Sequence, residues 1–405
     1  MAAVKSYVDV LLSPSTQHYL SNHTMNCVQV GQLYNTVSAA FWRADFWLPP
    51  GIEWELMEEN EEMPMPNFYD VWVYPLLLSV LMVLLHSFII QPYLMEPLAT
   101  VAGISNKRPS PPAACPILET LYSRHGIKPS DSQVKEATNA SGMTRRQVER
   151  WLRRRHRLAQ PTPFEKFADS GFNLMCHLIT GIYGWCTILH KPWVSDISQT
   201  YIGHPYHPLD NEVWWYYILG LSYFWAATFM QIHLPGRSTS DKAQMMLHHL
   251  FTILLMVFSW ACNFVRAGTL VLLVHDVADI PLLTGKMCVY GGFSILQDLC
   301  LVLFIIVWVI TRCYLYPFWF MRALIFDFAP INETRSISVF MVLLVGLLII
   351  NIIWTVLIVG VIIRKIKEGS VQDVRSDVEA TDTEEEEKEV EETLMPALHA
   401  KPKAD

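Results

Sequence analysis

Several long stretches of this 405-residue chain contain no Asp, Glu, Lys or Arg. The two clearest cover residues 71–95 and 336–363 and are almost entirely apolar. A helix needs about 20 consecutive apolar residues to cross a bilayer, so each stretch is long enough to do so. We therefore predict an all-α, polytopic integral membrane protein.

The same search predicts about seven transmembrane helices. The candidate spans cover residues 71–95, 171–190, 213–234, 243–265, 267–285, 287–311 and 336–363. Arg266 and Gly268 mark a tight turn between the fourth and fifth spans. The fifth span contains Asp276 and Asp279, and the sixth contains Asp298. Charged side chains are thus expected inside the bundle.

The charged residues that the spans lack are concentrated in the C-terminal tail. Charged residues make up 17% of the chain, against about 25% in an average soluble protein. Between Glu368 and Thr393 there are twelve acidic and two basic residues, which account for the net charge of −8. We expect residues 367–405 to form a disordered, acidic tail. Its candidate sites for an acidophilic kinase are Ser376, Thr381 and Thr383.

Basic residues near the spans predict how the chain is oriented. Seven arginines lie within residues 145–157, and three further basic residues follow the last span at 364–367. Basic loops stay on the cytosolic side, and an even number of spans separates the two groups, so both can be cytosolic. Residues 1–70, which show no signal peptide, are then luminal. The sequon that begins at Asn22 is the best candidate for N-glycosylation.

Two capping-box patterns lie between the first two spans, starting at Ser130 and Thr144. Each can open a helix, and together they give a helix-turn-helix pattern. Residues 106–160 resemble the second half of a homeodomain, with Trp151 leading a basic helix. We expect no first helix, because residues 107–116 are rich in proline. Arg154 stands where homeodomains place an adenine-reading Asn, so anionic lipid headgroups or coenzyme A phosphates suit this segment better than DNA bases.

The strongest chemical signal is a group of ionisable residues in the fourth and fifth spans, namely His248, His249, His275, Asp276 and Asp279. Ionisable residues are costly in a bilayer and usually face a cavity or one another. His249 lies 17 residues before the turn at residue 266, and Asp279 lies 13 residues after it. At ~1.5 Å per residue, a helical hairpin brings the two groups to a similar depth. We expect one site in the cytosolic half, and the alternative is interhelical hydrogen bonding alone.

An imidazole beside carboxylates suits two kinds of chemistry. It can take a proton from an amine, or it can itself accept an acyl group. A nearby carboxylate fixes the tautomer of the imidazole and stabilises the imidazolium. Such a group could also hold a metal ion, but the chain lacks the further His motifs of fatty-acid hydroxylases and desaturases. The pattern therefore favours acyl transfer without a metal or redox cofactor.

The stretch 241–287 is similar to the signature of the ceramide synthases within the TLC-domain family. The resemblance covers nearly the whole chain and implies a TLC-type six-helix core at residues 164–366. It implies an endoplasmic-reticulum enzyme, able to form homo- or hetero-dimers, that transfers a fatty acyl group from acyl-CoA to a sphingoid base. The catalytic residues it implies are His248, His249, Asp276 and Asp279, and we expect His275 and Asp298 to support them.

Two other functions stay open from the sequence. One is a TLC protein that binds or moves lipid without catalysis, which would need neither both His nor both Asp. The other is a membrane-tethered regulator that binds DNA through the Trp151 helix.

The expected site also predicts where a bound acyl chain ends. A C16 chain spans ~20 Å against a hydrocarbon core of ~30 Å, so it would end near the luminal side. Residues 316–335 are expected to join the sixth and seventh spans there. The bulky residues of this segment that we expect to set chain length are Phe318, Trp319, Phe320, Leu324 and Phe326. The alternative is that these aromatics form an interfacial belt.

Overall fold

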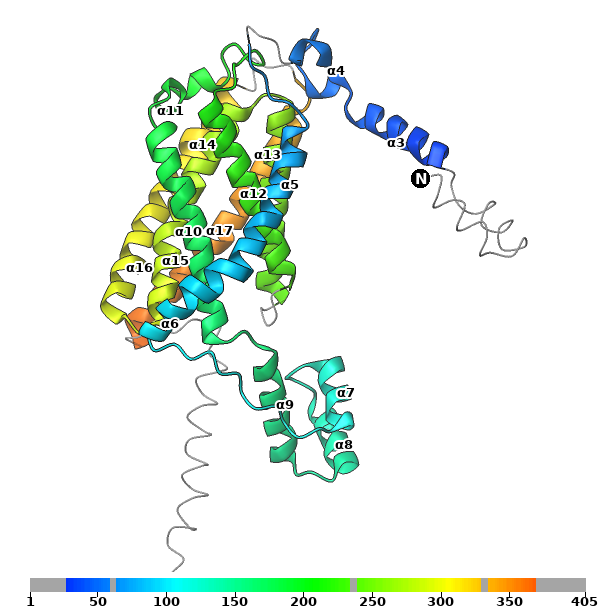
Figure 1. Ribbon diagram of the computed structural model, residues 1–405, viewed down its shortest axis with the longest axis vertical. Helices are drawn as coiled ribbons and strands as arrows, with labels where there is room; N and C mark the ends of the chain where they lie inside the picture. Colours follow the sequence, from blue (N-terminus) through cyan, green and yellow to red (C-terminus); the bar gives the residue numbers. More distant parts are fainter. Residues whose placement is uncertain (1–26, 59–62, 234–238, 329–333, 369–405) are drawn as a thin grey trace, which may run out of the picture.

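The computed structural model describes residues 27–58, 63–233, 239–328 and 334–368. Within these ranges the chain is helical and contains no strand, so the all-α expectation is confirmed. Long helices form an upright bundle, and a small group of three helices hangs below it (Figure 1). These three helices lie within residues 106–160, which we call the insert, and we call this lower side the insert end of the bundle. The N-terminal helices α3 (Cys27–Phe41) and α4 (Ala44–Trp47) lie at the opposite end.

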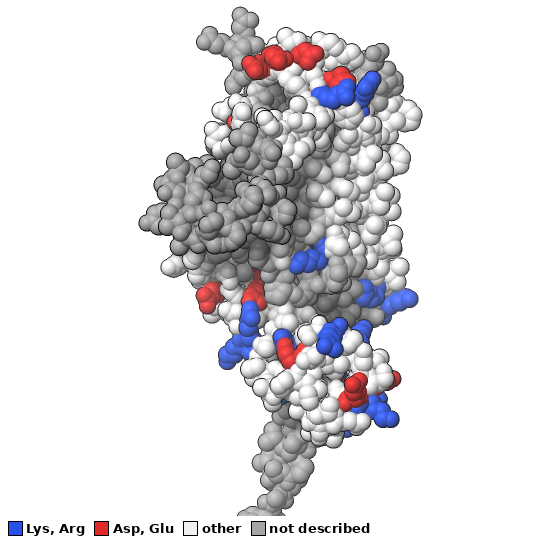
Figure 2. All heavy atoms as spheres, turned by 90° about the vertical axis from the view of Figure 1, so that its right-hand side faces the viewer, with Lys and Arg blue, Asp and Glu red and all other residues white. Residues whose placement is uncertain are grey.

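Five helical stretches are long and apolar enough to cross a membrane, at Asp70–Val101, Lys242–Ala261, Val265–Tyr290, Ser294–Phe328 and Ile337–Lys367. Two further long helices, α10 (Pro163–Thr187) and α12 (Asn211–His233), stand among them (Figure 1). On the face shown in Figure 2, charged side chains gather mainly towards the two ends, and most of the described surface between them is uncharged. This is the charge distribution expected of a protein whose middle faces lipid.

The bundle begins with α5 (Asp70–Leu85), which continues through η2 (His86–Met95) and α6 (Glu96–Val101). Its antiparallel hairpin is α13 (Thr239–Ala261) followed by α14 (Val265–Asp276). The turn between them lies at residues 262–264, so Arg266 and Gly268, which were predicted to mark it, are in fact part of α14. The last helix is α17 (Ile337–Glu368). Short elements, α11 (Pro192–Ser195) and η3 (Ile197–Thr200), cover the end opposite the insert.

The fifth span is interrupted where its two carboxylates lie. Asp276 is the last residue of α14, and Asp279 is the first residue of α15 (Asp279–Tyr290). Pro281 lies in the first turn of α15, where its missing N–H costs no helical hydrogen bond. The local sequence thus breaks the helix between the two aspartates, and it places Asp279 at a helix N-terminus that favours negative charge.

The predicted boundaries of the sixth span are wrong. Residues 287–290 still belong to α15, and the chain turns at Gly292, which adopts a φ of 71°. The next helix, α16 (Ser294–Trp308), continues as a wider π-type helix through η4 (Val309–Met321) and η5 (Ala323–Phe328). Most of the segment expected to be a connecting loop at 316–335 is therefore helix. The wider turn tolerates Pro317, which would break a regular α-helix.

The insert is a three-helix unit, so the expectation that it lacks a first helix is wrong. Helix α7 (Pro116–His125) starts directly after the proline-rich stretch, because proline is well suited to the first helical position. Helices α8 (Asp131–Ser141) and α9 (Arg145–Ala159) start at the two predicted capping boxes, and both boxes form. The core of the insert consists of Leu118, Val134, Ala137, Val148, Trp151 and Leu152.

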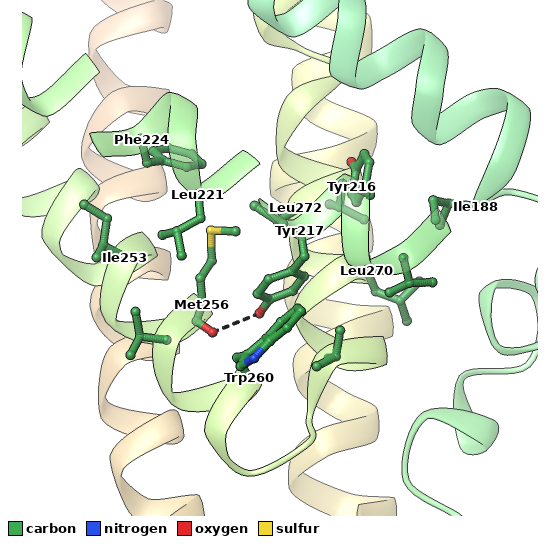
Figure 3. Packing of buried hydrophobic residues seen from close by; sticks show 14 of the residues in the cluster. Ile188, Tyr216, Tyr217, Leu221, Phe224, Ile253, Met256, Trp260, Leu270 and Leu272 are labelled. Carbon is green, nitrogen blue, oxygen red and sulfur yellow. Dashed lines mark hydrogen bonds between the residues drawn. The ribbon is translucent and has the colours of Figure 1, made fainter. Parts of the chain in front are cut away.

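Close packing fixes α14 against its neighbours in the bundle core (Figure 3). Tyr217 from α12 lies beside Trp260, and its hydroxyl donates to the carbonyl of Met256, 3.3 Å away. A Cβ at Gly268 would collide with this hydroxyl, so glycine is required for α14 to approach α12 so closely. The hairpin that carries the predicted site residues is therefore held rigidly against α12.

Candidate active site

A single cavity of about 830 Å³ runs inside the bundle and collects the predicted site residues. At the insert end it is lined by polar and basic residues, including Gln160, Lys166, Lys286 and Arg364. At the other end its walls are aromatic and aliphatic, including Phe264, Phe320, Phe328 and Phe340. The polar group from the hairpin lies between these regions, and its members on the wall are His248, His249, His275, Asp276 and Asp279. The cavity therefore changes from basic to apolar along its length, with ionisable groups in between.

His249 is held by a threonine on α12. The Thr228 hydroxyl donates to the carbonyl of Phe224 at 2.6 Å, and it lies 3.0 Å from Nδ1 of His249. A hydroxyl has one proton to donate, so Thr228 must accept from an Nδ1–H. The neutral imidazole then carries its proton on Nδ1, and Nε2 is its basic nitrogen.

His248 lies beside its neighbour in a more apolar setting. Its ring is 5.1 Å from the ring of Trp354 and 6.0 Å from that of His249, centroid to centroid. Nδ1 of His248 is buried and has no hydrogen-bond partner among the described residues. The two histidines are thus distinguished by their surroundings, since a hydroxyl fixes the tautomer of His249 only.

His275 is held in place through both ring nitrogens. Its Nδ1 donates to the carbonyl of Val271 at 2.7 Å, and its Nε2 accepts from the Asn351 side chain at 3.3 Å. The ring packs edge-on against Tyr316. With both nitrogens engaged, His275 is suited to fixing α14 against α17 and η4.

Arg312 on η4 neutralises one of the two carboxylates. It is only 3% exposed, and its guanidinium donates to Asp279 at 3.4 Å, to the carbonyl of His275 and to Asn351 at 3.2 Å. The guanidinium also lies over the ring of Trp308. Its Nε–H is buried without a hydrogen-bond partner among the described residues, and Arg312 lines the cavity. Arg312 thus keeps one buried N–H donor that no described residue uses.

Asp276 is surrounded by a second group of polar residues. Its Oδ2 accepts from the Thr180 hydroxyl at 3.1 Å, and its Oδ1 lies 3.5 Å from Nδ1 of His177. On the other side of the ring, Nε2 of His177 lies 3.1 Å from the Tyr223 hydroxyl, which donates to Asn173 at 2.9 Å. The two aspartates thus have different partners, a guanidinium for Asp279 and an imidazole for Asp276.

Sequence reasoning missed His177, Tyr223 and Arg312. His177 lies in the middle of a span without Asp, Glu, Lys or Arg whose other histidine, His190, is at its end, and one histidine in such a place carries little information by itself. Arg312 was placed just outside the sixth span, because that helix was expected to end at residue 311. A signal for His177 does exist, since residues 166, 169, 173, 177 and 180 recur every three or four positions and are all polar. They form a polar stripe on α10.

Asp298 does not belong to this group. It lies near the start of α16, its side chain is 56% exposed, and it forms an ion pair with Lys365 of α17. The expectation that it supports the catalytic residues was wrong, because the shifted boundary of the sixth helix moves Asp298 from the middle of a span to an end of the bundle.

The five residues expected to limit chain length lie on the helical surface of η4 and η5, and they do not share one environment. Phe320 and Leu324 line the cavity. Trp319 packs against the bundle core. Phe318 and Phe326 point outwards, with 64% and 68% exposure. Four other predicted sites, the sequon at Asn22 and the kinase sites at Ser376, Thr381 and Thr383, lie outside the described residues.

Helical bundle, cavity and buried ionisable cluster together define a class of protein, the polytopic membrane proteins with a TLC domain. The sequence model for the TLC domain matches residues 166–360.

Known proteins narrow this class further. Ceramide synthase 3 of Mus musculus is 31% identical over 351 residues, which cover 86% of this chain and 90% of that protein. Ceramide synthase 5 of Homo sapiens is 29% identical, covering 85% of this chain and 88% of its own length. Ceramide synthase hyl-2 of Caenorhabditis elegans is 28% identical, and the match covers 83% of this chain and 93% of that protein. The chain belongs to the ceramide synthase family.

Proposed function

We propose that this protein transfers a fatty acyl group from acyl-CoA to the amine of a sphingoid base. Its family membership supports an acyltransferase, and the observation that carries the specific reaction is the cavity. A single cavity joins a basic rim, a group of His and Asp residues and a long apolar end. These three regions match the three parts of an acyl-CoA, namely the phosphates, the thioester and the hydrocarbon chain. No metal or redox cofactor is needed for this reaction.

His249 is the residue best suited to the central step. Its Nδ1 proton is directed to Thr228, so Nε2 can take the proton of the attacking amine or can itself attack the thioester. Arg312 Nε–H would stabilise the negative oxygen of the tetrahedral intermediate, in the manner of an oxyanion hole. Asp279 holds this guanidinium in position. His248 borders the same region and would complete the catalytic group with Asp276.

The test is acylation of sphinganine by the purified protein with a panel of acyl-CoAs of different chain length. We expect His249→Ala and His248→Ala to abolish N-acyl sphinganine formation while the protein still inserts into membranes. Wild-type turnover in the double variant would remove both histidines from the mechanism. Binding of lipid without any acylation by the wild-type protein would favour the non-enzymatic alternative.

A covalent route through an acyl-imidazole predicts one further result. If an imidazole accepts the acyl group, incubation with acyl-CoA alone should add one acyl mass to the intact protein. Substitution of the acylated histidine should prevent this addition. An unchanged mass under single-turnover conditions, together with normal product formation, would favour direct attack by the amine.

We propose an endoplasmic-reticulum location with the N-terminus in the lumen and the insert in the cytosol. The basic residues of α9 and of the end of α17 support this orientation. Treatment with an N-glycosidase should shift the mobility of the wild-type protein and leave that of Asn22→Gln unchanged. Glycosylation at Asn139, in the exposed end of α8, would instead put the insert in the lumen.

The insert supports DNA binding less well than the cavity supports acyl transfer. Trp151 is buried in its core and donates to the carbonyl of Ala113 at 2.6 Å. Arg155 is engaged with Glu119, and Arg145 with Asp131. The exposed basic surface of the insert lies near the start of α10, at the insert end of the bundle. There it is suited to anionic headgroups or to coenzyme A phosphates.

A further inference from the structure

The hydrogen bonds around His177 determine where its protons lie. The amide nitrogen of Asn173 donates to the backbone carbonyl of Asp169 at 2.7 Å, which orients the amide so that its oxygen faces Tyr223. The Tyr223 hydroxyl donates its single proton to this oxygen at 2.9 Å. Its oxygen must therefore accept from Nε2 of His177, so Nε2 carries a proton.

The second nitrogen of His177 must share a proton with Asp276. Nδ1 and Oδ1 of Asp276 are 3.5 Å apart, and both residues are buried. A lone pair on Nδ1 facing a bare carboxylate would be repulsive in this setting. One proton is therefore held between the two residues, either on Nδ1 or on the carboxyl group.

Charge balance gives the same result. The charged groups around His177 are Asp276 on α14, Asp279 at the start of α15 and Arg312 on η4. Its other titratable neighbours are Tyr223 on α12 and His248 on α13. Arg312 neutralises Asp279. Asp276 would thus remain an uncompensated buried charge, which is costly in a low-dielectric interior, unless the shared proton neutralises it.

The proton also has a route towards the basic rim of the cavity. The polar stripe of α10 runs from Thr180 through His177 and Asn173 to Lys166, and the last three line the cavity. Tyr223 lies on the wall beside this stripe. A rotation of its O–H away from Asn173 would point the proton into the cavity, while Nε2–H of His177 would replace it.

We propose that Asp276, His177 and Tyr223 form a proton relay that acts as the general acid for the departing thiolate of acyl-CoA. This inference rests on the proposed function. When the carbon–sulfur bond breaks, its electron pair goes to sulfur, and sulfur receives the Tyr223 proton. Tyr223 recovers a proton from His177 Nε2, which leaves the pair with Asp276 one proton short. The amine proton taken by His249 then returns through the cavity to this pair. The same acid serves whether the acyl group passes to the amine directly or through an imidazole.

The test compares two acyl donors that differ in their need for an acid. Acyl-CoA has a basic thiolate leaving group, whereas the 4-nitrothiophenyl thioester of the same fatty acid releases a thiolate that needs no proton. General acid catalysis contributes about 10²–10⁴-fold. We expect Tyr223→Phe and His177→Phe to lower kcat with acyl-CoA by at least about 100-fold and kcat with the activated thioester by less than about 10-fold.

Tyr216→Phe is the matched control. Tyr216 lies on the same helix, is buried, and its hydroxyl has no hydrogen-bond partner among the described residues. Its ratio of kcat values for the two donors should equal that of the wild type. Because each ratio comes from one preparation, loss of folded protein affects both donors equally and cancels.

Equal losses with both donors in Tyr223→Phe and His177→Phe would overturn the relay and leave a purely structural role. Unchanged kcat with acyl-CoA in these variants would overturn it as well. The proposed function fails separately, if the wild-type protein acylates sphinganine from neither donor.

Discussion

Thr228 provides the sharpest test of how the site is built, because it acts on His249 through one hydroxyl group. Thr228→Val keeps the shape of the side chain and removes the oxygen that lies 3.0 Å from Nδ1. A buried donor without a partner costs about 1–3 kcal/mol. The imidazole would reduce this cost by moving its proton to Nε2, which is the nitrogen required as a base. At about 1.4 kcal/mol for each factor of ten in rate, we expect kcat to fall by about 10- to 100-fold.

The assay is the rate of N-acyl sphinganine formation at saturating acyl-CoA. KM should change little, because Thr228 acts through His249. Thr228→Ser keeps the hydroxyl and should retain most of the activity. Thr252→Val is the matched control, since Thr252 lies on the cavity wall and, like Thr228, donates to a carbonyl in its own helix, that of His248. Wild-type kcat in Thr228→Val, or an equal loss in Thr252→Val, would refute the reasoning.

Three further predictions follow from other contacts. Arg312→Met should destabilise the protein by about 3–5 kcal/mol, because it leaves Asp279 without its cation; thermal unfolding in detergent measures this, and an unchanged Tm would contradict it. Phe320→Ala should enlarge the apolar end of the cavity and shift products towards longer acyl chains. Phe318→Ala should not, because Phe318 points outwards. Lipid mass spectrometry of the products measures the chain lengths that each variant uses. Burial lowers the pKa of His204, in the connection before α12, to about 3. As the pH falls, His204 therefore takes up a proton in the unfolded chain at a pH where it stays neutral in the folded chain. The free energy of unfolding should fall by about 2 kcal/mol between pH 7 and pH 5, and His204→Phe should reduce this loss.

The sequence determined the features that depend on neighbouring residues. Runs of apolar residues located most helices, because crossing a bilayer requires a minimum length without charge. The capping boxes at Ser130 and Thr144 located two helix starts to the residue, since such boxes involve only four consecutive positions. The sequence also identified the hairpin of α13 and α14, and with it the cluster that includes His249 and Asp276.

Boundaries that depend on helix geometry were harder to predict. A π-type continuation such as η4 has no distinct apolar period, so the sixth helix was ended too early. That one error placed Arg312 outside the bundle and Asp298 inside it. The first helix of the insert was missed for a related reason, because proline was taken to exclude a helix when Pro116 in fact begins one.

Only the tertiary structure decided which side chains meet. Spacing along a hairpin gives the depth of a residue, but the direction of its side chain towards other helices depends on how all of them pack. Thr228 on α12 therefore contacts His249, and His177 on α10 lies 3.5 Å from Asp276, although residues far apart in sequence supply each pair. The same packing encloses a cavity whose basic rim and aromatic end come from several different helices, so no single stretch of sequence contains it.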